Sequence, residues 1–263
     1  LLIAKEERTK LDIPANLRLL DQLADRLEAG LAKAGTVQQR LDALKDLLFV
    51  QEKFGLPSED SAEAFLLCDV LKNRRGNCLG LSVLCLALAE RAGLKLHGVP
   101  VPSRSSGPGH LLVRYDDGQT RVNFDPTQQG ASHPDEHYLK LFNLKETDLK
   151  AGYILSSAKP RLILNLLLVN LGGERIVAGR AAAALPLLEG AHKLKPDYAP
   201  LHNNLGAAYL ELGDWANAQK AYEQAIRWDP NFVGAKLGLG ELALRAGKVE
   251  GAEGAGKSRL LRE

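Results

Sequence analysis

The chain has 263 residues, enough for one large domain or two ordinary ones, and its 45% apolar and 25% charged residues are typical of a folded protein. A formal net charge of +2 argues against a dedicated nucleic-acid binder, and three cysteines cannot all pair, which excludes a disulfide framework. No apolar run reaches the roughly 18 residues that a membrane span requires. Methionine is absent, so we expect the natural start to lie upstream, and the compartment stays open between cytoplasm and periplasm.

The first half of the chain is predicted to be mainly helical. Residues 14–55 carry the apolar spacing of two amphipathic helices, which Gly30 and Gly55 punctuate. A further helix, expected over residues 78–92, is apolar on nearly every side and should therefore be buried. Asn77 is a suitable N-cap for this helix, and Gly93 is a suitable stop.

A strand pair follows, formed by HLLVRY and QTRVNFD around Asp117-Gly118, a dipeptide typical of two-residue hairpin turns. Such a turn pairs residue 116 with residue 119 and so places His110 directly opposite Asp125, with Cβ atoms about 4.5–5.5 Å apart. An imidazole and a carboxylate at this distance can form a hydrogen bond. The other face of the pair is apolar and belongs on the core, so we expect the face with His110 and Asp125 to look outward or into a cleft.

The three cysteines differ in their predicted surroundings. Cys78 lies at the first turn of the buried helix, where free backbone N–H groups and the helix dipole favour a thiolate over a thiol. Cys85 is two turns further along, about 10 Å away, and Cys68 lies upstream; we expect both to be small core residues. Taken together, Cys78, His110 and Asp125 fit a thiol nucleophile with a base and an orienting carboxylate.

The C-terminal third repeats itself with a period of 34 residues. Residues in equal positions of successive copies are Leu171-Gly172, Leu205-Gly206 and Leu239-Gly240; Gly179, Gly213 and Gly247; and Ala184, Ala218 and Ala252. Small residues at fixed places, a glycine turn and a closing proline resemble the tetratricopeptide repeat (TPR). The resemblance implies an α-helical array over residues 165–263 that offers a surface to a protein partner. His202 stands where the family usually has Trp, and the second helix of the third copy is expected to be Gly-rich and cut short.

The preceding segment, residues 1–156, carries a second resemblance. The stretches RRGNCLGLSVLCLALAERAGLKLHGVPVP, GHLLVRY and VNFDPTQQG resemble the bacterial transglutaminase-like core family of the Sir-B type. The resemblance implies an α+β, papain/transglutaminase-like core, in which a buried helix packs against a short antiparallel sheet. It also implies a catalytic triad of Cys78, His110 and Asp125.

The chemistry that this resemblance implies is acyl transfer on a protein or peptide amide, with no cofactor. Cys78 would attack the carbonyl, His110 would serve as base and then as acid, and the thioester would pass to water or to an amine. The backbone N–H of Cys78 is a natural oxyanion donor, and the Asn77 side chain a weaker one because capping already occupies it. The alternative is a non-catalytic protein with a degenerate transglutaminase-like domain, whose TPR array binds a partner or only buttresses the core.

Two further motifs receive no functional role. The stretch GAEGAGKS, which begins with Gly251 and ends with Ser258, matches the Walker A pattern GxxxxGK(S/T) but lacks the preceding strand, so we expect no nucleotide there. His133 and His137 are four residues apart, a spacing that could chelate a metal on a helix face. A helix start capped by Ser132 explains them better, and we expect no metal site.

Overall fold

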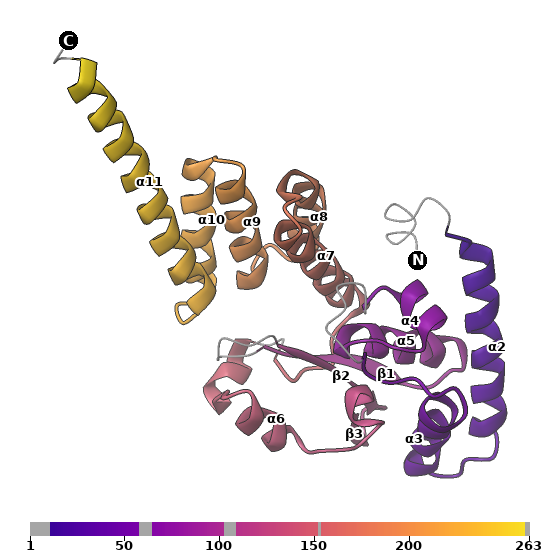
Figure 1. The fold of residues 1–263 in the computed structure, drawn as a ribbon. Coiled ribbons are helices and arrows are strands. Elements are labelled where there is room, and N and C mark those ends of the chain that lie inside the picture. The colour runs from indigo at the N-terminus through magenta and orange to yellow at the C-terminus, as the bar shows by residue number, and fades with distance from the viewer. Residues whose placement is uncertain (1–10, 58–64, 103–108, 152–153, 261–263) are drawn as a thin grey trace. The chain divides into compact units, whose positions relative to one another are not determined.

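The computed structural model describes residues 11–57, 65–102, 109–151 and 154–260. The chain divides into two compact units, one ending at Ile163 and the other beginning at Leu164. Helices make up most of both units, and the first also holds a small antiparallel sheet (Figure 1). Within the described ranges, no helix combines the length and the apolar character that crossing a bilayer demands.

The first unit combines helices with three strands. Its helical elements are α2 (Ile13–Leu31), α3 (Val37–Lys45), the π-helical turn η1 (Asp46–Gln51), α4 (Leu67–Asn73), α5 (Cys78–Arg91), the 3-10 turn η2 (Pro126–Gln128), α6 (Asp135–Leu141) and the 3-10 turn η3 (Glu146–Ala151). The strands β1 (Leu96–Val101), β2 (His110–Asp116) and β3 (Arg121–Phe124) pair antiparallel in that order. The predicted α+β core is therefore confirmed.

The two N-terminal amphipathic helices correspond to α2 and to α3 with its continuation η1. Each begins at a side-chain cap: Asp12 accepts from the backbone of Ala15, and Thr36 forms a capping box with Gln39. Their apolar faces enter the main core together with α5, which packs against β1, β2, α2 and α4. The caps thus determine where these helices begin, and the spacing of their apolar residues determines which face of each helix packs into the core around α5.

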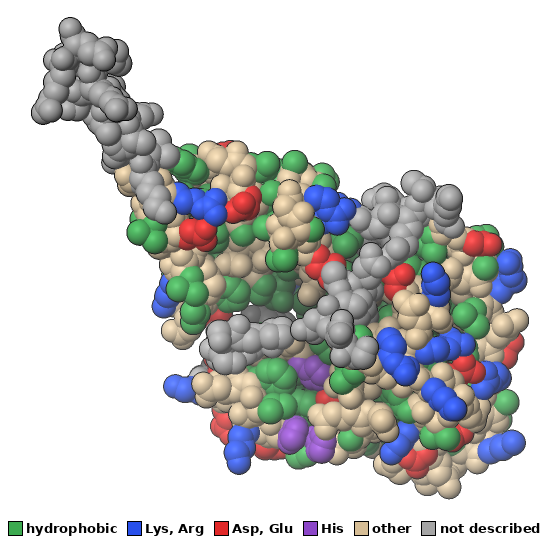
Figure 2. Space-filling view, in the orientation of Figure 1, with side chains coloured by type: hydrophobic (Ala, Val, Ile, Leu, Met, Phe, Trp, Pro, Cys, Tyr) green, Lys and Arg blue, Asp and Glu red, His purple; other side chains and the backbone are tan. Residues whose placement is uncertain are grey.

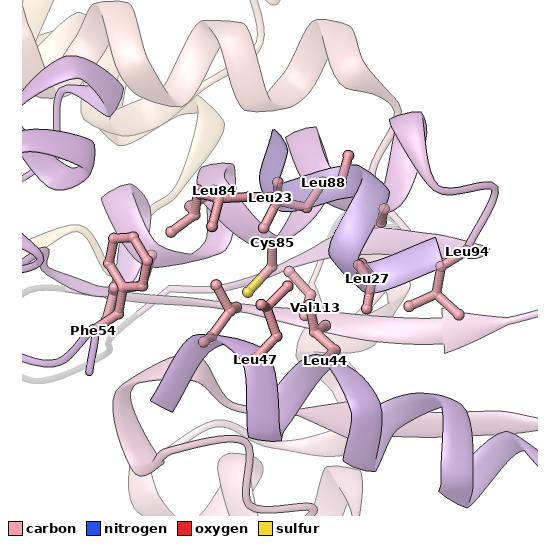
Figure 3. Packing of buried hydrophobic residues seen from close by; sticks show 14 of the residues in the cluster. Leu23, Leu27, Leu44, Leu47, Phe54, Leu84, Cys85, Leu88, Leu94 and Val113 are labelled. Atoms are coloured by element: carbon pink, nitrogen blue, oxygen red, sulfur yellow. The ribbon is translucent and has the colours of Figure 1, made fainter. Parts of the chain in front are cut away.

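The main core surrounds α5, as its continuous apolar character requires. Figure 3 shows Cys85 of α5 directed toward Leu44 of α3 and Leu47 of η1, with Val113 of β2 beside them. Cys85 is fully buried, and burial raises the pKa of its thiol far above the ordinary value. Cys68 on α4 is also buried. Both residues occupy the core positions expected of them.

The hairpin between β2 and β3 differs from the predicted register. Asp116 pairs with Arg121, so the connection has four residues instead of two. The Asp117 side chain explains the wider loop, because its Oδ1 accepts from the backbone N–H groups of Gln119 (3.0 Å) and Thr120 (2.8 Å). The prediction that His110 lies directly opposite Asp125 is therefore wrong by two residues. A shift of two positions keeps every side chain on its original face.

Both faces of the sheet are covered, which argues against an outward-looking face, one of the two alternatives expected for the face with His110 and Asp125. Val113, Tyr115 and Phe124 belong to the main core, as predicted. The opposite face is covered by a second apolar cluster that includes Val99, Val101 and Leu112 of the strands, Tyr138 of α6, and Leu144, Ile154 and Leu155 beyond it. Asp125 on this face is completely buried, and only 12% of the His110 side chain is exposed. The chain after β3 folds back over this face.

The second unit is a helical array, as the 34-residue period predicts. Its helices are α7 (Pro160–Val177), which begins in the first unit, α8 (Ala181–Leu194), α9 (Ala199–Glu211), α10 (Trp215–Trp228) and α11 (Val233–Leu260). Gly179 and Gly213 adopt positive φ angles at the turns between the paired helices, where glycine is favoured. The predicted order of an α+β core followed by an α-helical array is therefore confirmed.

The third repeat departs from the predicted pattern. A helix turn was expected at Gly247, by its equivalence with Gly179 and Gly213, followed by a short second helix. Instead α11 continues through Gly247 as one helix of 28 residues. The stretch from Gly251 to Ser258 is helical over its whole length, whereas a phosphate-binding loop precedes its helix.

Candidate active site

Cys78 is the first residue of α5, and its position follows from the cap before it. Asn77 Oδ1 accepts from the Gly80 backbone N–H at 3.0 Å, and the Asn77 backbone has the extended conformation of an N-cap. Cys78 is partly exposed, in contrast to Cys68 and Cys85. The thiol thus lies at the positive end of a 14-residue helix, where an anion is stabilised.

His110 is the first residue of β2, and its side chain contacts Asp125, which directly follows β3. Nε2 of His110 lies 2.9 Å from Oδ2 of Asp125, a hydrogen-bonding distance. In the observed register these residues are diagonal neighbours, which lie about 7–8 Å apart at the backbone and remain within reach of long side chains. Figure 2 shows His side chains at the surface of the first unit beside a group of hydrophobic ones. The imidazole of His110 is held by Asp125, and 12% of its side chain is exposed.

Asp125 is held by several donors besides His110. Oδ1 accepts from the Thr127 hydroxyl at 2.7 Å and from the Thr127 backbone N–H at 3.0 Å, while Oδ2 accepts from Gln128 Nε2 at 3.2 Å. Burial alone would raise the pKa of Asp125, but the hydrogen bond from His110 and those from Thr127 lower it below its usual range. The carboxylate is therefore charged and fixed in orientation.

The charge on His110 follows from its two polar neighbours. Burial alone would lower the pKa of His110, but the hydrogen bond to Asp125 and then the one to Cys78 raise it to about 9. Asp125 is thus the hydrogen-bond partner of His110, and Cys78 is the further polar group whose proximity raises this pKa. Since Nε2 is engaged by Asp125, Nδ1 is the ring nitrogen left for another partner.

Aromatic side chains on α6 cover the imidazole, and sequence reasoning missed them. The rings of Phe142, just after α6, and Tyr138 stack on His110 with centroids 5.8 and 6.3 Å away. Tyr138 is fully buried, and burial and then the Asp125 charge raise the pKa of its hydroxyl. The four-residue spacing of these two aromatics on a helix that follows Asp125 closely was the available signal.

A buried arginine fixes α6 against the sheet, and it too was missed. Arg114 Nε donates to Asn123 Oδ1 at 2.7 Å, Nη1 donates to the Leu155 carbonyl at 2.9 Å, and Nη2 forms an ion pair with Asp135 at the start of α6. Only 4% of the Arg114 side chain is exposed. An arginine in the apolar run HLLVRY, four residues after His110 and so on its face, was the signal for this network.

The two histidines with the four-residue spacing, His133 and His137, both lie against Tyr138 of this site. His133 and His137 stack with ring centroids 4.2 Å apart, and His133 hydrogen-bonds to Gln128 Oε1 at 3.0 Å. Among the described residues, no group of three or more His, Cys, Asp or Glu side chains could hold a metal ion. The helix begins after Pro134, so Ser132 is not its cap, because His133 and Pro134 separate it from the first helical residue, Asp135.

Comparison with protein families agrees with this architecture. A family described as "Transglutaminase-like superfamily" matches residues 15–168, more than half of the chain. The chain belongs to the transglutaminase-like superfamily. Two further matches, described as "Tetratricopeptide repeat", cover residues 176–220 and 203–259. The superfamily member therefore carries TPR repeats after its core domain, and residues 15–168 include α5 and all three strands.

Two of the similar proteins match this chain over most of its length. A "UPF0162 protein" of Xylella fastidiosa is 26% identical over 252 residues, 92% of this chain and 86% of that protein. A UPF0162 protein of Pseudomonas aeruginosa is 30% identical over 203 residues, 74% and 70% of the two chains. A "Hsp70-Hsp90 organizing protein" of Triticum aestivum is 45% identical over 62 residues, which are 24% of this chain and 11% of that protein.

Proposed function

We propose that this superfamily member, of the Sir-B type, is a thiol hydrolase or acyltransferase that acts on a protein or peptide amide through Cys78, His110 and Asp125. The observation that carries the proposal is the 2.9 Å contact between His110 Nε2 and Asp125 Oδ2. It is supported by the position of Cys78 at a helix N-terminus and by its effect on the pKa of His110. This is the order of nucleophile, base and orienting acid that acyl transfer requires.

The proposed reaction has two halves. The Cys78 thiolate attacks the substrate carbonyl carbon, a C–S bond forms, and the carbonyl electron pair moves to oxygen. When this pair returns, the C–N bond breaks and the leaving amine takes a proton from the His110 imidazolium, which leaves a thioester on Cys78. Neutral His110 then takes a proton from water or from an acceptor amine as it attacks the thioester, and Cys78 is released as thiolate.

The developing oxyanion has two donors within this site. The backbone N–H of Cys78 belongs to the first turn of α5, where N–H groups have no helical partner. The capping bond of Asn77 uses Oδ1 alone, and among the described residues no acceptor pairs with its Nδ2. Capping therefore leaves the Asn77 amide N–H groups available, and they can join the Cys78 N–H in stabilising the oxyanion.

The test is the rate at which the full chain is acylated by p-nitrophenyl acetate. We expect one acetyl group on Cys78, found by mass spectrometry of the digested protein, and a matching burst of p-nitrophenol. Replacing the base in His110→Ala should slow this acylation about 10²–10⁴-fold, with Cys85→Ser as a matched variant that leaves the rate unchanged. Equal acylation of Cys78 with and without His110 would contradict the proposal.

The second candidate function is that of a non-catalytic interaction protein. It is favoured by the TPR matches over residues 176–259 and by the similarity of 62 residues to an organizing protein of another species. In that case the triad geometry is a remnant and the array carries the function. The acylation test separates the two candidates, because a scaffold has no reason to keep His110-dependent reactivity at Cys78.

A further inference from the structure

Three glycines that are 34 residues apart occupy the same place on the first helix of each repeat. On α7 a Cβ added at Gly172 would come within 2.6 Å of Leu188, and on α9 one added at Gly206 would come within 2.6 Å of Tyr222. Leu188 and Tyr222 belong to the second helices of their repeats, α8 and α10. In both cases a large side chain therefore fills the space above the glycine. At Gly240 on α11, an added Cβ would meet nothing within 4 Å.

The side chains next to Gly240 are exposed where their counterparts are buried. Leu210 of α9 is 3% exposed, whereas Leu244, its counterpart on α11, is 69% exposed. Ala199 is 4% exposed, and its counterpart Val233 is 46% exposed. Val233, Gly240 and Leu244 are seven and four residues apart and so lie along one side of the helix. We call these three residues the Gly240 face.

The residues in the second half of α11 are unsuited to cover the Gly240 face. By the 34-residue period, Gly256 takes the place of Leu188 and Tyr222, so it offers no side chain to fill the space above Gly240. Arg259 takes the place of Ala225, which is completely buried. Folding back would bury a guanidinium in a site built for a methyl group. The observed continuation of α11 as one helix agrees with this argument.

We propose that the Gly240 face docks an amphipathic helix of a separate protein, which completes the third repeat from outside. The two complete repeats define the chemistry of this helix, because the same interface continues from α7 and α9 onto α11. It should place a leucine or an aromatic ring over Gly240, with alanine four residues before and three after, as Ala218, Tyr222 and Ala225 do on α10. The inference does not depend on catalysis by Cys78.

The test uses the full chain and a capped, fluorescein-labelled peptide of residues 214–230, the chain's own example of such a helix. We expect saturable binding by fluorescence anisotropy, and a loss of at least tenfold in affinity for the same peptide with Tyr222→Gly. Gly240→Leu should abolish binding by filling the space, and it favours helix, so it should not unfold α11. Leu244→Asp should weaken binding at least tenfold, whereas the matched Leu212→Asp, at an exposed leucine outside the face, should leave it unchanged.

Three results would overturn the proposal. The first is no saturable binding of the peptide to the unaltered chain. The second is binding that Gly240→Leu leaves intact, because the peptide would then be replacing the chain's own α10. The third is a dimer of the full chain, seen by light scattering at micromolar concentration, that Gly240→Leu converts to a monomer. That result would make a second copy of this chain the occupant.

Discussion

His110 and Asp125 are joined by a hydrogen bond of 2.9 Å although they are not direct cross-strand partners. The four-residue loop moves Asp125 to the diagonal position, and the 3-10 turn η2 then begins at Pro126 with Asp125 as its N-cap. Thr127 in this turn holds the other carboxylate oxygen. The contact is therefore built by the turn after β3 as much as by the strand pair.

Cys78 should be far more reactive than the other two cysteines. Iodoacetamide at pH 7 should label Cys78 within minutes, because Cys78 is partly exposed whereas Cys68 and Cys85 are buried. Cys85 should stay unlabelled until the protein unfolds, because burial raises the pKa of its thiol. Peptide mapping after timed quenching measures both. Equal, slow labelling of all three residues would show that Cys78 is structural.

The His110 imidazole should keep its proton well above neutral pH. In an NMR titration its Cε1 proton should shift with a midpoint near pH 9, since the raised pKa comes from the bonds to Asp125 and Cys78. In Asp125→Asn the midpoint should fall below the ordinary 6.5, because burial, which lowers the pKa, then meets less opposition. A midpoint that Asp125→Asn leaves unchanged would mean that the 2.9 Å contact does not hold in solution.

The same pair should stabilise the first unit over a limited pH range. The His110 contribution is complete below pH 6.5 and is lost as the pH rises through about 9. The Asp125 contribution is present above its ordinary pKa of 3.8 and is lost as the pH falls through the lowered folded value. Thermal unfolding of the unaltered chain and His110→Ala should therefore differ most between about pH 4 and 6.5. A Tm difference that stays constant up to pH 10 would assign the loss to packing.

Removing the charge of Asp135 should cost more than removing that of Arg114. Asp135→Asn leaves a buried guanidinium without its counter-ion, which typically costs about 3–5 kcal/mol. Arg114→Met replaces the guanidinium with an apolar chain and leaves Asp135 partly exposed to water, so it should cost less. Adding Arg114→Met to Asp135→Asn should restore part of the stability. Urea unfolding of the four chains measures this, and strictly additive losses would contradict the coupling.

Replacing glycine with alanine at two equivalent positions of the array should change its stability in opposite directions. Gly206→Ala brings a methyl group against the Tyr222 ring, so it should lower the thermal midpoint of the array. Gly240→Ala meets nothing within 4 Å and removes backbone freedom from a helix, which should stabilise it by about 0.5–1 kcal/mol. Differential scanning calorimetry of the two variants checks the signs. Equal destabilisation by both would mean that the space above Gly240 is filled.

Local sequence signals determined the parts of this protein that depend on neighbours along the chain. Asn77 before an apolar run fixed where α5 starts, because an N-cap bond reaches only three residues. The 34-residue period fixed the helix pairs of the first two repeats, since each turn needs its glycine at a set place. The pattern of apolar side chains also put His110 and Asp125 on one face, because that pattern survives a register shift of two residues.

Tertiary contacts decided what local signals could not. Hydrogen bonds of the Asp117 side chain set the hairpin register, against the two-residue turn that Asp117-Gly118 favours. The chain after β3 packs over the face that carries His110, where the buried Arg114 forms an ion pair with Asp135 of α6. In the third repeat, nothing nearby in the sequence could fill the space above Gly240, and α11 stayed a single helix. Each outcome depends on contacts between residues that are remote in sequence, or on the lack of such a contact within the described residues. The spacing of apolar residues along the chain does not predict either.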